Sequence, residues 1–245
     1  METNKKEAIK KAVFIFVLVL LTLIALFVTI KYEIEGEQNP PFRLSKISII
    51  STADGIKAEE NKIEAWQVND IYISIEKNDN YTEKEMIKKV SIENMTVSEK
   101  PQIGKVAFYK PSSNEGIKYT YEKEYAIKDT LEYFGNKVTD VSSFSIANQG
   151  GTIEFRSCLK EIGNFEAAEN ETGYSHDASI LQKANVDLEQ IKYQIQFDLI
   201  IELEGGKKYK ANIELDLPNE DLEGQTVKGV EITDLENIVL KRMKF

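Results

Sequence analysis

Hydrophobic and polar residues alternate along most of the chain beyond residue 44. Between Ile71 and Ile75, for example, isoleucine occupies every second position, which is typical of a strand with one buried face. Turn-forming residues interrupt the alternation at short intervals, as in the segment Pro111–Asn114. Many short strands with this spacing predict a mostly β protein, in which residues 44–245 form an antiparallel β-sandwich-like domain.

The alternation predicts a series of strands along this domain. In chain order they are Ser45–Ser51, Val68–Glu76, Lys88–Ser98, Gly104–Lys110, Ile117–Glu122, Asp129–Phe134, Val141–Asn148, Thr152–Ile162, Lys192–Glu204, Lys208–Leu217, Gly229–Thr233 and Glu236–Arg242. Apart from the N-terminal region, one helix is predicted. Asp177 can cap residues Ala178–Ala184, and Val186–Ile191 can add a second turn.

The clearest hairpin lies between Gln194 and Pro218. Hydrophobic residues occupy odd positions on both arms of this segment, so odd positions must face odd positions if both sets are buried together. A two-residue turn at Gly205-Gly206 would break this register. The prediction is therefore a three-residue loop, Gly205–Lys207, in which glycine supplies a positive φ angle and Leu203 lies opposite Tyr209.

The N-terminal run from Ala12 to Ile30 differs from the rest of the chain. It contains no charge, proline or glycine, and Thr22 and Thr29 are its only polar residues. As a helix it would be about 28 Å long, close to the roughly 30 Å hydrocarbon core of a bilayer. A cleaved signal peptide usually has a shorter apolar region followed by small residues, and the sequence has neither feature. The run is predicted to be a retained transmembrane helix.

The charges around this run predict its orientation. Basic residues precede it and acidic residues follow it: Lys5, Lys6, Lys10 and Lys11 before, and Glu33, Glu35 and Glu37 after. Because basic flanks stay in the cytoplasm, the predicted order is a cytoplasmic tail (1–11), a helix across the lipid bilayer of the cell membrane (12–30), a tether (31–43) and an extracytoplasmic domain (44–245). The alternation is compatible with one domain or with two sub-domains in the last of these.

The outer part of the chain is acidic. Of the 31 basic and 41 acidic residues, four lysines and two glutamates precede the helix, which leaves 27 and 39 and a net charge of −12. Such a field repels phosphate backbones, and no basic stripe with interleaved aromatic residues occurs, so nucleic acid is not expected as a partner. Cys158 is the only cysteine, which rules out an internal disulfide.

Candidate catalytic chemistry is sparse. The segment Ser175–Asp177 contains the three residue types of a hydrolytic triad around the only histidine, His176, but adjacent residues rarely converge on one reacting atom. We expect a surface loop that ends in the Asp177 cap. One histidine and one cysteine do not supply the three or four ligands of a zinc site, and Cys158 is expected to be a small buried residue. No catalytic, cofactor-binding or metal-binding residue is predicted.

Carboxylates are abundant but form no recognised motif. A calcium-binding loop of the Asp-x-Asp-x-Asp-Gly type does not occur. Asp216, Asp221 and Glu223 could gather near Pro218 and bind calcium, although a plain acidic turn accounts for them as well. A glycosidase active site built from a pair of carboxylates is a further alternative.

Aromatic residues raise a further hypothesis. Tyr119, Tyr121 and Tyr125 share parity along a predicted strand and could form a platform for glycan stacking, with Trp66 elsewhere in the fold. Core tyrosines that pair across strands are the simpler explanation.

The chain resembles uncharacterised single-pass envelope proteins of Gram-positive bacteria. The resemblance rests on the lysine-flanked apolar helix, the tether and the hairpin that ends in the segment Leu215–Pro218, and it implies no activity. We expect a non-enzymatic, membrane-anchored domain that presents a binding surface to a protein partner, as a subunit of an envelope assembly. The alternatives are a carboxylate-dependent hydrolase of cell-wall glycan and a carbohydrate-binding module.

The predicted topology is testable on intact cells. Because lysines precede the apolar helix and acidic residues follow it, external protease should remove residues 31–245 and leave a short membrane-bound stub. A cytoplasmic marker protein that stays uncut serves as the control. Recovery of a mature protein that begins near Lys31 and lacks the helix would contradict a retained anchor.

Overall fold

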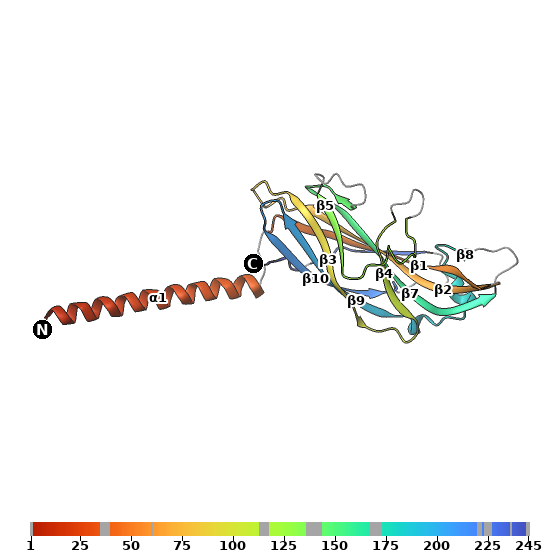
Figure 1. Ribbon diagram of the computed structural model, residues 1–245, viewed down its shortest axis with the longest axis horizontal. Coiled ribbons are helices and arrows are strands. Elements are labelled where there is room, and N and C mark those ends of the chain that lie inside the picture. The colour runs from red at the N-terminus through yellow and green to blue at the C-terminus, as the bar shows by residue number, and fades with distance from the viewer. Residues whose placement is uncertain are drawn as a thin grey trace.

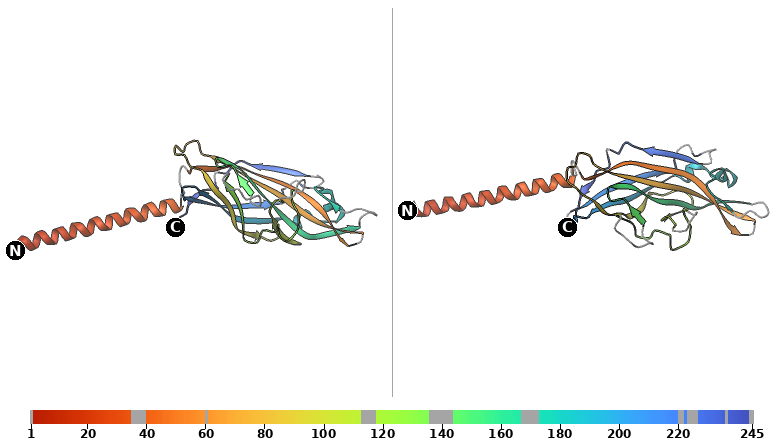
Figure 2. Two further views of the ribbon diagram at one scale, coloured as in Figure 1. Left: turned by 45° about the horizontal axis from the view of Figure 1, so that its top comes forward. Right: turned by 90° about the horizontal axis from the view of Figure 1, so that it is seen from above.

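The protein is described from a computed structural model, in which a long N-terminal helix leads into a domain of two packed sheets (Figures 1 and 2). The structure describes residues 2–34, 40–59, 61–112, 118–135, 144–166, 173–219, 222, 227–235 and 237–243. Most of the described residues lie in strands. The predicted fold class, a mostly β domain of sandwich type behind an apolar helix, is confirmed.

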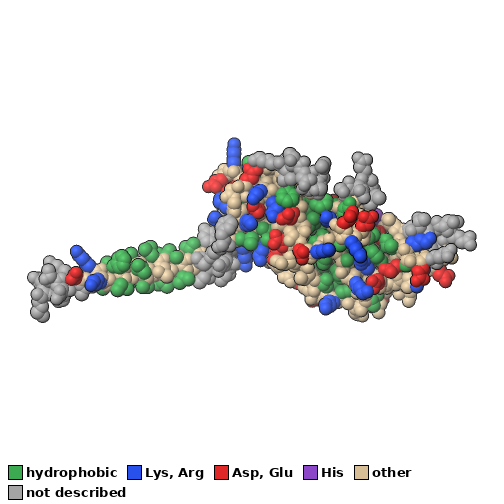
Figure 3. Space-filling model, viewed as in Figure 1, with side chains coloured by type: hydrophobic (Ala, Val, Ile, Leu, Met, Phe, Trp, Pro, Cys, Tyr) green, Lys and Arg blue, Asp and Glu red, His purple; other side chains and the backbone are tan. Residues whose placement is uncertain are grey.

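The helix α1 spans Glu2–Ile34. Its segment Ile9–Val28 is long and apolar enough to cross a membrane, and no part of that segment is buried against the domain. Figure 3 shows hydrophobic side chains covering this part of the helix. The helix continues beyond the predicted span to Ile34, and the first strand begins at Phe42, so the predicted tether (31–43) is shorter at both ends.

The first sheet contains six strands. They are β1 (Phe42–Glu59), β2 (Lys62–Lys77), β4 (Lys105–Tyr109), β7 (Gly150–Glu166), β8 (Gly173–Tyr174) and β11 (Lys228–Ile232). Their order is β11-β1-β2-β7-β4, with β8 also paired to β1, and every pair is antiparallel.

The second sheet also contains six strands. They are β3 (Ile87–Glu99), β5 (Thr130–Gly135), β6 (Phe144–Ile146), β9 (Tyr193–Leu203), β10 (Lys208–Leu217) and β12 (Lys241–Arg242). Their order is β12-β10-β9-β3-β5-β6, and only the β5–β6 pair is parallel.

The predicted helix after Asp177 is present but short. Helix α2 spans Ser179–Lys183, and a single 3-10 turn, η1, follows at Leu188–Gln190. The Oδ1 atom of Asp177 accepts a hydrogen bond from Ser179 N (3.0 Å), and Asp187 does the same for Glu189 N (3.0 Å). Each acidic residue therefore satisfies a free N–H group at the start of its helix.

Several strand boundaries differ from the prediction. β1 and β2 extend well past Ser51 and Val68. In the extension of β1, Asp54 is buried on the outer face of the sheet, and in the extension of β2 the buried Gln67 bonds to Asn69 on the inner face. The described part of the predicted strand Ile117–Glu122, residues 118–122, forms no strand. It lies over the outer face of the first sheet instead, and its tyrosines alternate although these residues form no strand. The predicted strand Glu236–Arg242 is reduced to β12, because the chain crosses there from one sheet to the other.

The core lies between the facing sides of the two sheets. Phe155 of the first sheet meets Phe197 of the second edge-on, with ring centroids 5.4 Å apart. A buried polar network crosses the same space. Asn69 Nδ2 donates to Tyr193 Oη (2.9 Å), and the Tyr193 hydroxyl also lies 2.9 Å from Ser157 Oγ. Because buried polar groups are costly when unpaired, this network favours one alignment of the sheets.

The β9–β10 hairpin keeps the predicted parity but not the predicted register. Tyr209 lies opposite Ile201 instead of Leu203. Leu203 N donates to Lys207 O (2.9 Å), so the three-residue loop is residues 204–206. Gly206 occupies the last loop position with φ +85°. A turn followed by a left-handed glycine is a common three-residue hairpin loop. It lies one residue earlier than the predicted loop, so each residue of β10 faces a residue of β9 two positions before the predicted one.

Candidate functional site

One side of the sandwich is not closed by strand pairing, and we call it the open side. It lies between the part of β10 that β12 leaves uncovered, in the second sheet, and β11, at the edge of the first. β10 pairs with β9 along its whole length, but with β12 only through Tyr209 and Lys210. None of the other described strands pairs with β10 between Ala211 and Leu217.

The described strands leave backbone groups unpaired along this edge of β10. At the open side, Lys208 O accepts a hydrogen bond from Met243 N (2.9 Å). Because backbone groups of successive residues point to opposite sides of a strand, the N–H and C=O groups of Asn212, Glu214 and Asp216 also point to the open side. A row of such groups is a template for another strand.

A pocket of about 350 Å³ lies behind this edge, between the two sheets. Its lining combines apolar side chains with polar ones: Ile49, Glu214, Leu215, Asp216, Pro218, Asn219, Lys228, Val230 and Ile232. Val230 lies opposite the buried Ile49 in the β1–β11 ladder, so its side chain points between the sheets. Yet Val230 is 38% exposed. An inward-facing valine that stays exposed shows that the two sheet edges do not meet here.

Both ends of the pocket are closed. At one end Asn219 joins the sheets: its N donates to Ser51 Oγ (2.9 Å), and its Nδ2 donates to the carbonyl oxygens of Ile49 (2.9 Å) and Lys228 (3.0 Å). At the other end the chain crosses from β11 to β12. The opening is therefore a bounded window beside Asn212–Leu217, about 20 Å long at the usual rise of a strand.

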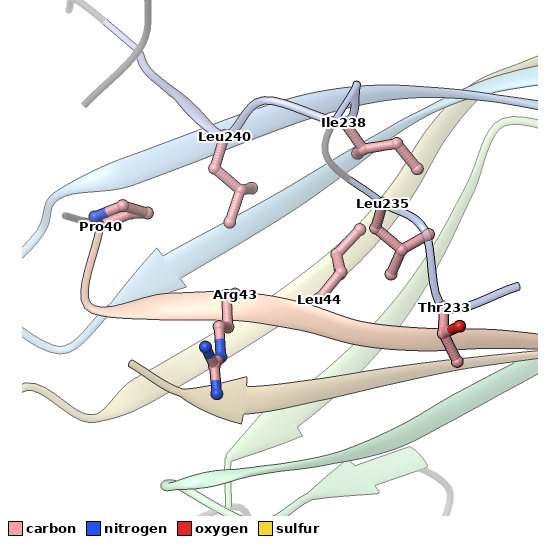
Figure 4. A pocket seen from close by; sticks show the side chains of 7 residues that line it. All are labelled: Pro40, Arg43, Leu44, Thr233, Leu235, Ile238 and Leu240. Carbon is pink, nitrogen blue, oxygen red and sulfur yellow. The ribbon is translucent and has the colours of Figure 1, made fainter. Parts of the chain in front are cut away.

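The crossover forms a second, smaller pocket with the start of β1. This pocket has a volume of about 290 Å³. Figure 4 shows Leu44, Leu235 and Ile238 around it, with Pro40 and Leu240 also in its lining. Pro40 is the first described residue after α1, so this pocket lies at the end of the domain that faces the helix (Figure 1).

The surface beside the edge of β10 is acidic. Glu214 and Asp216 are exposed, and Asp216 Oδ1 accepts a hydrogen bond from Gln194 Nε2 (2.8 Å). The nearby cation Lys210 is directed to another acid, with its Nζ 3.4 Å from Asp198 Oδ2. Among the described residues, no lysine or arginine forms an ion pair with Glu214 or Asp216.

The tyrosines of the predicted platform lie on the outer face of the first sheet. They form a cluster with residues of β2, β4 and β7: Trp66, Val68, Ala107, Tyr109, Tyr119, Tyr121, Tyr125, Ala126 and Cys158. Tyr121 packs edge-on against Trp66 (4.7 Å between ring centroids) and against Tyr109 (5.2 Å). The expectation that Trp66 lies elsewhere was wrong, because the β4–β5 connection folds back over the sheet and brings the tyrosines to it.

Arg156 lies beneath these rings. Its Nε and Nη2 donate to the two carboxylate oxygens of Asp70 (2.6 and 3.0 Å), and its Nη1 donates to Asp54 Oδ2 (3.2 Å) and Tyr121 Oη (2.9 Å). The Tyr121 hydroxyl donates to Asp54, and the Tyr119 ring covers the guanidinium, with its centroid 4.3 Å from Arg156 Cζ. One buried cation thus bonds to two buried carboxylates.

The pKa values of this cluster point to a fixed structural unit. Burial raises the pKa of the Tyr119, Tyr121 and Cys158 side chains above their ordinary values. Burial alone would lower the pKa of Arg156, but its hydrogen bonds and charge interactions with Asp70 and its other neighbours raise it. The two tyrosines and the thiol therefore stay protonated at neutral pH, and the guanidinium stays charged.

Sequence reasoning missed the Arg156 cluster. The signal that could have found it is the composition of β7, where an arginine stands in the otherwise uncharged segment Phe155–Leu159, in a chain with three arginines. A lone arginine inside a strand needs a carboxylate partner. The two acids come from β1 and β2, so only the sheet order identifies Asp54 and Asp70 as those partners.

The structure separates the members of the triad-like segment. Asp177 caps helix α2 through Ser179 N, as predicted. The side chain of His176 is exposed, while its backbone N donates to Asp54 Oδ1 (2.8 Å). Cys158 is fully buried in the aromatic cluster, as expected.

The carboxylates considered for calcium are only partly described. Asp221 and Glu223 lie outside the described residues, and Asp216 accepts a hydrogen bond from Gln194. Within the described part of the chain, no group of three histidine, cysteine, aspartate or glutamate side chains is placed to hold a metal ion.

The Arg156 cluster is expected to stabilise the domain strongly. Arg156→Met would leave Asp54 and Asp70 buried without a cation and should lower the free energy of unfolding by about 3–5 kcal/mol. The control is Arg43→Met, which removes an exposed pair with Glu76 and should cost at most about 1 kcal/mol. Denaturant unfolding of the full chain in detergent measures both, and equal effects would show that Arg156 is not a structural centre.

Comparison of the chain with protein-family models, with curated proteins and with solved structures found no match in any of the three. Function is therefore inferred from the geometry of this chain alone. The open side and the aromatic cluster are the two surfaces from which that inference can be made.

Proposed function

We propose that the protein is a membrane-anchored, extracytoplasmic β domain that binds a protein partner through its open side, as a subunit of an envelope assembly. The single observation that carries this proposal is the window beside Asn212–Leu217. There, a strand edge without a described partner borders a pocket of about 350 Å³ lined by both apolar and polar side chains. Exposed strand edges are sites of protein–protein pairing unless the fold covers them.

The fold covers a comparable edge elsewhere. At the outer edge of β4, Lys110 N donates to Tyr125 O (2.9 Å), and Ile127 N donates to Phe108 O (2.8 Å). The β4–β5 connection thus supplies the partner that a neighbouring strand would otherwise supply. The contrast with β10 supports a role for the open side in binding.

The aromatic cluster supports the carbohydrate-binding alternative less well. Glycan stacking needs ring faces that a sugar can reach. Tyr119 is buried and covers Arg156, and Tyr121 is enclosed between Trp66 and Tyr109. We infer that the rings mainly seal the buried ion pairs.

The hydrolase alternative also lacks geometric support. A glycosidase needs two carboxyl groups on either side of an accessible bond. Asp54 and Asp70, the carboxylates gathered at Arg156, are buried and occupied by hydrogen bonds. Their arrangement stabilises charge and leaves no room between them for a substrate.

Placement of the domain outside the cell follows from the sequence charges and is part of this proposal. Lysines lie before the apolar run Ala12–Ile30 and acidic residues lie after it. The helix would hold the open side within a short distance of the membrane surface, where partners of an envelope assembly also lie.

Site-specific photo-crosslinking in intact cells tests the proposal. A photoreactive amino acid at position 230 should give one discrete protein adduct, because this inward-facing position borders the window. The same residue at position 105, on the edge strand β4 far along the sheet order, should give none. Absence of a protein adduct at 230, or equal adducts at both positions, would overturn the proposal.

A further inference from the structure

We propose that the partner contributes an extended segment that adds to β10 as a further strand, with apolar side chains at alternate positions and lysine or arginine at the positions between them. This inference rests on the proposed function and specifies the chemistry of the partner at the same site.

The backbone of β10 supplies the first step of the argument. The N–H and C=O groups of Asn212, Glu214 and Asp216 point toward the open side, beyond the last β10–β12 pair at Lys210. An added strand can satisfy these groups in the way that β9 satisfies the groups on the other side. The window accommodates about six residues of an extended chain.

The inward side of the window selects apolar residues. Alternate side chains of an added strand would point between the sheets, beside Leu215 and toward Ile49, Val230 and Ile232, which line the pocket. Burying them would also cover Val230, whose inward-facing side chain is otherwise 38% exposed. Removal of this apolar surface from water favours binding.

The outward side of the window selects basic residues. The side chains of Glu214 and Asp216 are exposed on the outer face of β10, and side chains directly opposite one another in adjacent strands interact. Opposite charges at these positions stabilise a strand pair and like charges destabilise it. Lysine or arginine is therefore the complement of this edge.

The same charges disfavour two other occupants. A second copy of the chain that paired through its own β10 would bring Glu214 and Asp216 of both copies together. The chain's own segment 220–226 contains Glu220, Asp221 and Glu223, so it would also place acids beside acids. A heterologous basic and apolar segment meets neither penalty.

A synthetic peptide tests the inference on the full chain in detergent micelles at physiological salt. The probe is a labelled seven-residue peptide with alternating lysine and valine, followed by fluorescence anisotropy. One control has glutamate in place of lysine, and a second has the lysines and valines in two blocks. We expect the alternating peptide to bind at least tenfold more tightly than either control. Equal binding of the block peptide would reduce the interaction to net charge and overturn the inference.

Variants of the edge test the strand geometry. Glu214→Pro removes an N–H group that points away from β9, a position where an edge strand tolerates proline. Its control, Glu214→Ala, removes the same charge and keeps the N–H group. We expect Glu214→Pro to weaken binding of the alternating peptide at least tenfold relative to Glu214→Ala. Equal binding by the two variants would contradict strand addition.

A second pair of variants does not depend on proline. Val230→Trp should fill the pocket and weaken peptide binding at least tenfold. Val239→Trp, at an equally exposed valine (38%) outside both pockets, should not.

If crosslinking at position 230 finds a protein while all of the peptides fail to bind, the proposed function stands and strand addition is contradicted. If the crosslinked protein is a second copy of the chain, the heterologous partner is overturned.

Discussion

A β-strand carries hydrogen-bonding groups on both of its sides, and β10 has a described strand neighbour on only one side over residues 211–217. The rest of the open side follows from this constraint. The described part of the C-terminal segment reaches β10 only between Lys208 and Lys210, after it has crossed from the first sheet to the second. Because it crosses and does not run alongside β10, a window stays open between the sheets, and Val230 is exposed although it points inward.

The outer edge and outer face of the first sheet are covered, which makes this window distinctive. The C-terminal end of the β4 edge, at Phe108 and Lys110, is covered by the connection to β5. That connection also covers the outer face of the sheet, where Arg156 holds Asp54 and Asp70 beneath a layer of tyrosines. That layer buries the polar side chains of Asp54 in β1 and Asp70 in β2. The window is therefore framed by strands held in place on their other sides, which suits a binding site that must be ready before its partner arrives.

Local patterns in the sequence predicted much of the fold. The apolar run without charges predicted the helix, and the two-residue alternation predicted β3, β9 and β10 almost to the residue. The hairpin register differs from the prediction by two residues, because Gly206 occupies the last position of the loop. The alternation is the same for the loop 204–206 and the loop 205–207, so it cannot distinguish them. The strand expected at residues 117–122 was wrong over its described part, 118–122, since a loop over a sheet can show the same alternation as a strand.

Features that depend on sheet order were beyond the sequence. Asp54, Asp70 and Arg156 are separated by many residues and meet only because β1, β2 and β7 are neighbours. The open side requires two further facts, namely that β10 and β11 lie at facing edges and that the last strand is two residues long. Neither can be read from hydrophobic periodicity, because the residues of β10 alternate as regularly as those of a fully paired strand.

The central claim is that the edge of β10 is free in the isolated protein, and amide hydrogen exchange followed by nuclear magnetic resonance tests it most directly. In the full chain in detergent, the N–H groups of Asn212, Glu214 and Asp216 should exchange quickly, because they point to the open side. Those of Ala211, Ile213 and Leu215 should exchange slowly, because they donate to β9. Slow exchange along the whole strand would show that the edge is already covered and would contradict the account.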